Sequence, residues 1–387
     1  MRVAIINTLY EAIVDHVYGG DPTLARRAYA DQLAAIYAVG AAHADFQVTN
    51  LRALGHEVTE LFVNVEALQR TWAREAGLRI SPPLKSAAGQ VDRVRRRALR
   101  DARRWLGLAP KTRDHGWELE VPREQIRAFK PDVIVNCSLN TFPGWFLREL
   151  KESRTFLVGQ CSYSIPWDTI DLGPYDLLVS ADPAYIERFR QRSKRADYLP
   201  HAFETTILDR LGPAPATPEI GVCFVGSLTN EHLDRLGLLE RIAARVPMTC
   251  WVRGGEIVPE GSPLKATLRP PVWGYDMYRV LRNSRVVLNR HVDFALGVAA
   301  NIRLYETTGV GTLLLTDHAS NLGELFEGGR ECAVYRDADE CVRLIEHYLR
   351  HDDERRTVAA AGQARTLRQH TFRQRMERLM RLVEGAA

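Results

Sequence analysis

The stretch that decides the fold is residues 297–317, which read GVAANIRLYETTGVGTLLLTD. It predicts a turn, a short helix over 302–308, a break at Gly309 and Gly311, and a buried strand over 312–315. Glycine suits the end of a helix because it adopts the left-handed backbone that such turns use. A helix followed at once by a continuous apolar strand is typical of a parallel α/β repeat.

The same alternation continues in both directions along the chain. Its apolar runs are continuous, as expected for parallel strands that are covered on both faces. The predicted strands are 3–6, 58–63, 133–135, 156–158, 177–179, 220–225, 248–252, 285–288, 312–315 and 332–335. The predicted helices are 24–39, 46–54, 123–129, 145–152, 184–191, 233–245, 276–283, 302–308, 322–326, 338–351 and 356–383. This pattern predicts an α/β fold with parallel sheets.

A segment rich in Pro, Ala and Gly divides the chain at residues 209–219 (DRLGPAPATPE). Proline cannot continue a strand ladder or a helix interior, so this segment is expected to be a hinge linker. We therefore expect a Rossmann-like domain over residues 1–208 and a second one over 220–365. Residues 366–387 are expected to form a C-terminal helix that packs back on the first domain.

Composition limits the class of protein. The 387 residues are 45% hydrophobic and 26% charged, which is enough apolar material for real cores. The sequence shows no 18-residue apolar run and no leader peptide, so we expect a soluble, cytoplasmic protein. The net charge of +4, from 52 basic and 48 acidic residues, is too balanced to demand a nucleic-acid partner, and none is expected.

One basic segment stands apart, from Val91 to Leu106 (VDRVRRRALRDARRWL). It places a thin apolar stripe on a helical face among seven arginines. The simpler interpretation is a solvated helix in an arginine-rich chain. The alternative is weak contact with an anionic surface, which would make the protein peripheral at the inner membrane face.

Several common catalytic motifs are missing from the sequence. No GxGxxG follows the first strand, and no GxxxxGK[ST], GxSxG or HExxH occurs. These absences argue against dinucleotide enzymes, P-loop nucleoside triphosphatases, α/β-hydrolases and zinc proteases. An α/β pattern without them leaves nucleotide-sugar chemistry as the natural candidate, with ligands outside the carboxyl ends of the strands in a cleft between the domains.

The turn before the short helix offers a ligand site. The backbone from Gly297 to Asn301 presents N–H groups at a helix N-terminus, which suits a diphosphate. Arg303 can add a bidentate phosphate contact. Glu306, one turn later, can accept hydrogen bonds from two ribose hydroxyls. The alternative is a plain αβ unit with Glu306 in solvent.

Other polar residues follow predicted strands. Asn289 and His291 come directly after the strand at 285–288, so they are expected at its carboxyl end and near a ligand. Arg253, in the sequence WVRGG, ends another strand and can meet a phosphate in the cleft. A structural turn is the alternative for WVRGG.

The stretch NIRLYETTGVGTLLLTD resembles the signature of group 1 glycosyltransferases with the GT-B architecture, in particular the CgeB-like branch. Three further stretches fit that family in order. They are DYLPH at 197–201, VCFVGS at 222–227, and HTF at 370–372 followed by Arg373 and Arg375. The resemblance covers roughly residues 195–380, and over residues 1–190 it is only architectural.

The resemblance implies two Rossmann-like domains that face each other across a cleft. It implies transfer of a sugar from a nucleotide diphosphate sugar to an acceptor hydroxyl, without a metal or any cofactor beyond that co-substrate. The acceptor would be a saccharide, a lipid-linked molecule or a small molecule, as in bacterial polysaccharide biosynthesis. Glu306 would bind ribose, with Arg303 near the diphosphate.

In this architecture the general base comes from the first domain. Asp15 and His16, which follow the first strand, are the candidates that we select. The alternative is that both are simply solvated. Retaining members of the group carry a second glutamate eight positions before the one at Glu306, but this position is Val298, so the stereochemistry stays unassigned.

Two other functions stay open. A nucleotide-sugar 2-epimerase shares the architecture and would convert the donor without any acceptor. A non-catalytic protein that binds a sugar nucleotide or a glycan would retain the binding residues without any transfer, and the valine at position 298 keeps this alternative open.

Overall fold

Two parallel sheets form the framework of the chain in a computed structural model, which describes residues 1–41, 44–80, 116–151, 154–161, 163–228, 233–291 and 297–385. Each sheet has six strands, in the orders β2-β1-β3-β4-β5-β6 and β12-β11-β10-β7-β8-β9. Every strand pair in both sheets is parallel. The predicted α/β fold with two Rossmann-like sheets is confirmed. The arginine-rich segment from Val91 to Leu106 lies outside the described residues.

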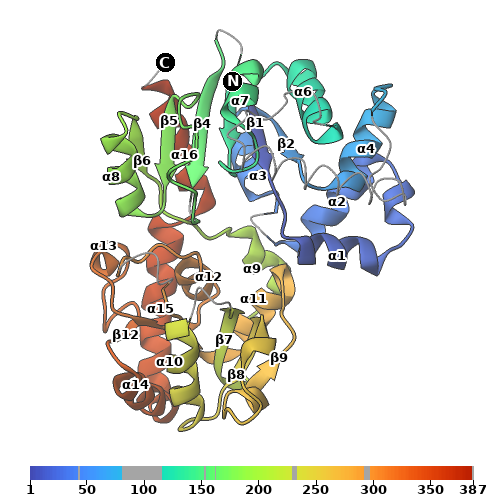
Figure 1. The fold of residues 1–387 in the computed structure, drawn as a ribbon. Helices are drawn as coiled ribbons and strands as arrows, with labels where there is room; N and C mark the ends of the chain where they lie inside the picture. The colour runs from blue at the N-terminus through green and yellow to red at the C-terminus, as the bar shows by residue number, and fades with distance from the viewer. Residues whose placement is uncertain are drawn as a thin grey trace, which may run out of the picture.

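The first sheet and its helices form the upper lobe (Figure 1). Its strands are β1 (Arg2–Asn7), β2 (Glu57–Phe62), β3 (Val133–Asn136), β4 (Phe156–Cys161), β5 (Leu177–Ser180) and β6 (Ala196–Tyr198). Its helices are α1 (Glu11–Gly20), α2 (Tyr29–Val39), α3 (Phe46–Ala53), α4 (Glu66–Glu75), α6 (Trp117–Phe129), α7 (Gly144–Leu150) and α8 (Pro183–Gln191). All residues of β3 and β5 are buried, which explains why their sequences are apolar without alternation.

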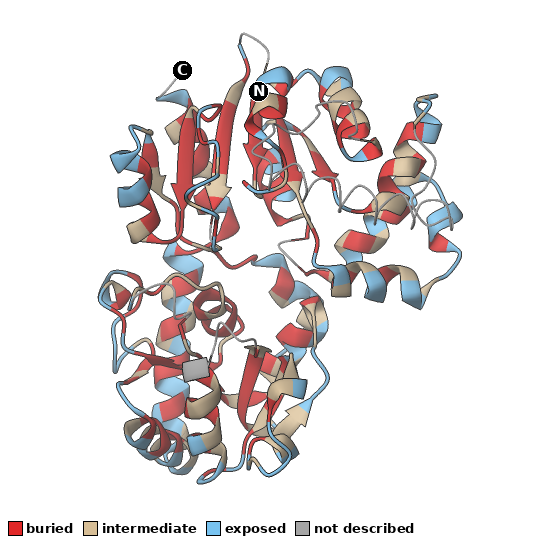
Figure 2. Cartoon of the chain, in the orientation of Figure 1, coloured by how far each residue is buried: buried red, intermediate tan, exposed pale blue. Residues whose placement is uncertain are grey.

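The second sheet forms the lower lobe. Its strands are β7 (Ile220–Ser227), β8 (Thr249–Arg253), β9 (Leu268–Arg269), β10 (Ser284–Leu288), β11 (Leu313–Asp317) and β12 (Ala333–Tyr335). Its helices are α10 (Leu233–Ala243), α11 (Gly274–Arg282), α12 (Arg303–Gly309), α13 (Leu322–Leu325), α14 (Ala338–Arg350) and α15 (Asp352–Gln369). In both lobes the strands are mostly buried and the outer helix faces are exposed (Figure 2).

The chain crosses between the lobes twice, and the two crossings are bonded to each other. The Phe203 N–H donates to the His370 carbonyl (2.9 Å), and the Phe372 N–H donates to the Phe203 carbonyl (3.0 Å). After the second crossing, α16 (Phe372–Glu384) packs against α3 and the core of the first sheet. The C-terminal helix therefore lies on the upper lobe (Figure 1).

Three predicted segments differ from the structure. The single helix expected over 24–39 is a short 3-10 helix (Leu24–Arg26) followed by α2, because the backbone is extended at Arg27 and Ala28. Residues 209–211 of the expected linker are helical, because α9 (Thr206–Leu211) extends into it. The single helix expected over 356–383 is two helices, because Thr371 caps α16 with a capping box that includes Gln374. None of the helices in the described ranges combines the length and apolarity needed to span a bilayer.

Candidate functional site

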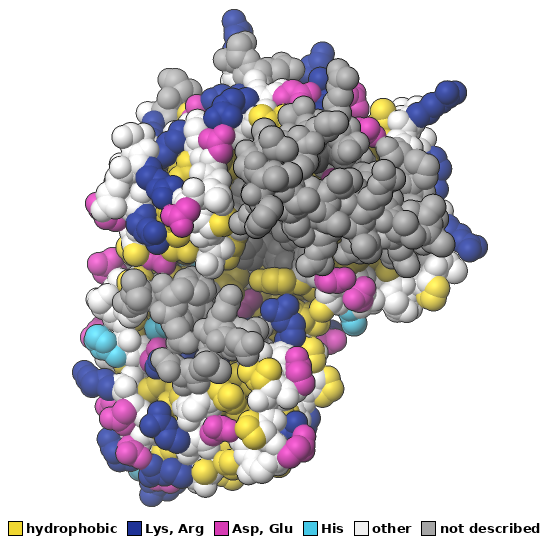
Figure 3. Space-filling view, in the orientation of Figure 1, with side chains coloured by type: hydrophobic (Ala, Val, Ile, Leu, Met, Phe, Trp, Pro, Cys, Tyr) yellow, Lys and Arg dark blue, Asp and Glu magenta, His cyan; other side chains and the backbone are white. Residues whose placement is uncertain are grey.

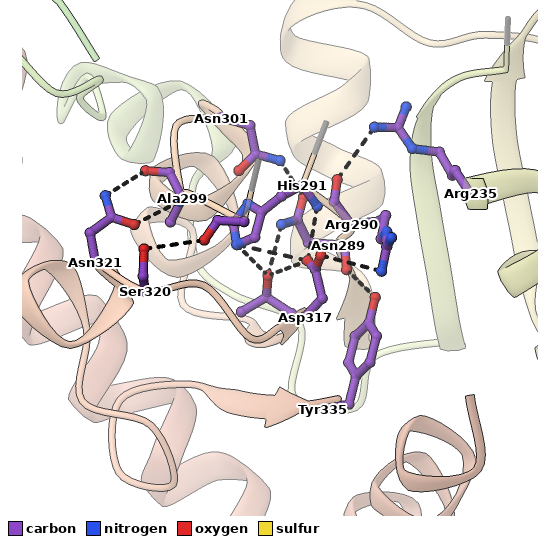
Figure 4. A network of polar contacts seen from close by, with 12 residues as sticks. Arg235, Asn289, Arg290, His291, Ala299, Asn301, Asp317, Ser320, Asn321 and Tyr335 are labelled. Atoms are coloured by element: carbon purple, nitrogen blue, oxygen red, sulfur yellow. Dashed lines mark hydrogen bonds and ion pairs between the residues drawn. The ribbon is translucent and has the colours of Figure 1, made fainter. Parts of the chain in front are cut away.

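A polar network lies at the carboxyl edge of the second sheet, where β10 and β11 end (Figure 4). Neighbouring parallel strands finish at the same edge, so residues that follow them in sequence meet in space. Asn289 and His291 follow β10, and Asp317 ends β11. All three side chains are buried. The structure thus brings together residues that are up to 28 positions apart in the sequence.

Asn289 connects this edge to the turn before α12. Its side-chain N–H donates to Thr316 Oγ1 (2.9 Å), and its side-chain oxygen accepts from Asn301 Nδ2 (2.7 Å). Its backbone carbonyl accepts from the Tyr335 hydroxyl (2.8 Å). Both ends of the Asn289 amide are engaged inside the protein. We conclude that Asn289 positions Asn301.

Asp317 anchors the loop that follows β10. Its Oδ1 accepts from the His291 backbone N–H (2.8 Å), and its Oδ2 lies 3.5 Å from Arg290 Nη1. Burial lowers the pKa of His291, while the Asp317 carboxylate acts in the opposite direction. The dominant effect is burial, which favours neutral imidazole at this edge.

The turn before α12 is held by a second asparagine. The Ala299 N–H donates to Asn321 Oδ1 (2.7 Å), and Asn321 Nδ2 donates back to the Ala299 carbonyl (3.1 Å). Gly297, with φ of +81°, accepts from the Ser320 N–H (2.9 Å). One N–H of the predicted amide site is therefore used inside the protein. The first N–H groups of α12 have no acceptor within the helix itself, as at every helix start.

Glu306 is buried beside a cation. Its Oε2 lies 2.7 Å from Arg303 Nη1, and its Oε1 accepts from the Tyr278 hydroxyl at 3.3 Å. The side chains of Glu306 and Arg303 are 8% and 15% exposed. Burial, then the Glu306 charge, raises the pKa of Tyr278, so this phenol stays a donor. The alternative that placed Glu306 in solvent is excluded.

Arg253 ends β8 on the exposed surface and faces the other lobe. Its guanidinium carbon lies 5.6 Å from the centre of the Tyr10 ring, which belongs to the first lobe. The Tyr10 ring also lies 6.1 Å from that of Trp273. The two lobes therefore touch close to the carboxyl end of β8.

Asp15 and His16 lie in helix α1, whereas the sequence indicated only a position after the first strand. The buried face of α1 carries Ile13 and Val17, and both candidate residues are exposed. Among the contacts described for the network of the second sheet, none involves Asp15 or His16. Their role as general base stays a prediction.

Sequence reasoning did not select Arg235. Its guanidinium is buried and donates to the Ser227 carbonyl (2.9 Å) and the Arg290 carbonyl (3.4 Å), so it ties the ends of β7 and β10 together. Nothing in the sequence separates it from the many surface arginines. Asp317 did carry a signal, since it ends the apolar strand in the quoted stretch. Among the described residues, no group of three or more His, Cys, Asp or Glu side chains is placed to hold a metal ion.

Comparison with known proteins bears on the fold and on the second half of the chain. Residues 232–381, less than half of the chain, match a family model described as "Glycosyl transferase-like". No curated protein matches the chain in sequence. The fold is similar to that of HepE from Anabaena solved with UDP and glucose, with a TM-score of 0.60, 11% identity and 100% of each chain covered.

Two more solved structures share the architecture. Sucrose-phosphate synthase from Thermosynechococcus elongatus has a TM-score of 0.53 at 12% identity, with 100% of each chain covered. A glycosyltransferase from Rickettsia africae has a TM-score of 0.58 at 9% identity, covering 100% of this chain and 98% of that one. The chain therefore has the GT-B fold. Its second half contains a glycosyltransferase-like domain, while membership of the CgeB-like branch stays a prediction.

Proposed function

We propose that this protein is a glycosyltransferase that moves a sugar from a nucleotide diphosphate sugar to an acceptor hydroxyl. The observation that supports this most directly is the buried pair of Glu306 and Arg303 at the carboxyl edge of the second sheet. A carboxylate and a guanidinium held 2.7 Å apart in the first turns of α12 offer an acceptor for ribose hydroxyls beside a cation for phosphate.

In the proposed complex, the second lobe holds the donor. Glu306 accepts hydrogen bonds from the ribose, and Arg303 and the first N–H groups of α12 contact the diphosphate. Charge grows on the diphosphate as the glycosidic bond breaks. These positive groups stabilise the departing anion, so we propose that no metal ion is required. The solved complexes of HepE with UDP and glucose support a donor of this class.

The acceptor binds on the side of the first lobe. Its hydroxyl oxygen forms the new bond to the anomeric carbon, the diphosphate leaves with the electron pair, and a base receives the hydroxyl proton. Asp15 and His16 are the residues proposed for this step. We propose a saccharide, lipid-linked or small-molecule acceptor, and a place in bacterial polysaccharide biosynthesis in the cytoplasm. The configuration at the anomeric carbon stays unassigned, since Val298 lacks a carboxylate.

A panel of nucleotide diphosphates and their sugars, screened by thermal shift and then by transfer to simple saccharides, tests this function. A ligand at about 100 times its Kd should stabilise the fold by about 2.7 kcal/mol. Glu306→Gln and Arg303→Met should lose that stabilisation, whereas the control Glu324→Gln, at an exposed residue of α13, should retain it. Conversion of the donor in the absence of any acceptor would instead identify a 2-epimerase. Binding without any transfer would identify a non-catalytic protein.

A further inference from the structure

A cavity opens on the lower lobe between helices α10 and α14. Its volume is about 330 Å³, which is within the range of small-molecule sites. Leu238 of α10 and Ala338 of α14 form part of its wall, and Tyr335, the last residue of β12, forms another part. The cavity therefore lies where strands of the second sheet end, the edge at which open α/β sheets bind ligands. The proposed glycosyl transfer does not use it.

The lining of this cavity carries an excess of positive charge. Arg241 of α10, Arg290 after β10 and Arg336 before α14 all line it. Among the described residues of the lining, Asp337 is the one acidic residue, and its Oδ1 caps α14 by accepting from the Glu340 N–H (2.8 Å). On the visible face of the lower lobe, by contrast, basic and acidic side chains are interspersed (Figure 3). Three guanidiniums against one carboxylate therefore distinguish the cavity from that surface and favour an anionic ligand.

The three guanidiniums retain donors for such a ligand. No described residue forms a hydrogen bond or ion pair with Arg241. Arg336 Nη1 lies 3.6 Å from Glu340 Oε1, but its side chain is 71% exposed, so this pair is weak. Arg290 Nη1 lies 3.5 Å from Asp317 Oδ2, and a guanidinium has five N–H donors in all. The planar fork of these donors matches the oxygens of a phosphate group.

Gly237 keeps one wall of the cavity open. It lies in the interior of α10, where glycine is less favourable than alanine because its backbone loses more entropy on folding. A Cβ added at this position would meet open space, so packing does not require glycine here. An unforced glycine inside a helix indicates a functional reason. The missing side chain leaves room beside Arg241, which follows one turn later on the same side of the helix.

The cavity is separate from the proposed diphosphate site at the start of α12. Along β10, Val286 and Leu288 share an apolar core with α10 and α14, whereas Val287 shares the other core with α12. Successive side chains of a strand point to opposite faces of a sheet, so the cavity and α12 lie on opposite faces. In Figure 4 the Arg290 side chain extends to the side opposite Asn301. The two sites therefore approach each other only at the sheet edge.

We propose that this cavity binds the phosphate group of a small phosphorylated molecule. Arg241, Arg290 and Arg336 donate to the phosphate oxygens. The cavity is about ten times the volume that one water molecule occupies in the liquid (about 30 Å³), so it also holds a short organic group attached to the phosphate. This inference does not depend on glycosyl transfer, because Glu306 and Arg303 take no part in it.

Thermal-shift titration of the whole protein with glycerol 3-phosphate, inorganic phosphate and glycerol tests the proposal. We expect the phosphate ester to bind most tightly, inorganic phosphate more weakly, and glycerol not at all. The double variant Arg241→Gln/Arg336→Gln should weaken the ester about tenfold or more, because charge-assisted hydrogen bonds are lost. Gly237→Met should weaken it too by filling the cavity. The control Arg343→Gln, at an exposed arginine of α14 outside the lining, should bind it normally.

The donor site offers the competing explanation, because Arg303 also attracts phosphate. If the ester still stabilises Arg241→Gln/Arg336→Gln but no longer stabilises Arg303→Met, the anion lies at α12, and the proposal is overturned while the proposed function survives. A wild-type protein that neither phosphate nor its ester stabilises would also overturn it. Inorganic phosphate that binds as tightly as the ester would overturn the assignment to a phosphorylated molecule.

Binding of UDP by each variant shows that its fold is intact, since none of the substituted cavity residues belongs to the proposed donor site. Gly237→Met is expected to fold, because methionine is a better helix former than glycine and open space surrounds the position. If that variant nevertheless fails to fold, the double arginine variant decides alone, because Arg241 and Arg336 are exposed.

Discussion

Acid should destabilise the junction between the lobes through His370. This imidazole is buried: its Nε2 lies 3.0 Å from the Leu325 carbonyl oxygen, and its Nδ1 lies 2.7 Å from Arg375 Nη2. Arg375 also donates to the carbonyls of Pro200 (2.9 Å) and Gln369 (3.0 Å), one on each chain crossing. Since arginine is always a donor, Nδ1 must be unprotonated and Nε2–H must donate to Leu325.

The pKa of His370 follows from this geometry. Burial, then the Arg375 charge, lowers it from the ordinary 6.5 to about 4. Between these two values the unfolded chain binds a proton that the folded protein excludes. Stability is therefore complete above about pH 6.5 and falls as the pH drops toward 4. A difference of about 2.5 pKa units corresponds to about 3 kcal/mol.

Urea unfolding of the wild type and His370→Asn at pH 7 and pH 4.5 checks this prediction. Asparagine retains a donor and an acceptor but does not titrate. At pH 7 the wild type should be the more stable protein, and its advantage should shrink by about 2 kcal/mol at pH 4.5. Other titrating groups are common to both proteins and cancel in the difference. An advantage of equal size at both pH values would refute the assignment of a neutral, buried His370.

Three further perturbations have defined outcomes. Gly274→Ala should lower the Tm by several degrees, because the new Cβ would lie 1.8 Å from the Val39 carbonyl oxygen. The control Gly237→Ala, which has open space around the new Cβ, should leave the Tm unchanged, and differential scanning calorimetry compares the two variants. Arg235→Met should cost about 1–3 kcal/mol in urea unfolding and weaken donor binding, because two carbonyls at the strand ends lose their donor. Burial raises the pKa of Glu60 from 4.5 to about 7. The free energy of unfolding should therefore decline by about 3 kcal/mol as the pH rises through this range. Glu60→Gln should flatten that decline when unfolding is measured as a function of pH.

The strands with continuous apolar sequences could be predicted from the sequence because both of their faces are covered. β11 is an example, since all five of its residues are buried. β9 was missed because two residues show no periodicity, and α1 was missed although it has 10 residues. The break between α15 and α16 was also missed, although Thr371 and Gln374 have the spacing of a capping box.

The candidate site likewise contains residues that a local sequence pattern places and residues that only the packing of distant segments places. The positions of Glu306 and Asn301 could be predicted, because their distance from a glycine break and an apolar strand indicates the start of a helix at a sheet edge, while their role in binding stays a prediction. The roles of Arg235 and Tyr10 depend on which segments pack against them. Arg235 bonds carbonyls at the ends of two strands, and Tyr10 meets residues from the other lobe. No local pattern in the sequence encodes either of those contacts.

The most direct measurement of the central claim is a crystal structure of the protein soaked with a nucleotide diphosphate such as UDP. We expect the ribose hydroxyls within hydrogen-bond distance of the Glu306 carboxylate, and the diphosphate beside Arg303 at the start of α12. Density for the nucleotide at any other place, or a Glu306 carboxylate that still contacts only Arg303 and Tyr278 at saturating UDP, would contradict the account.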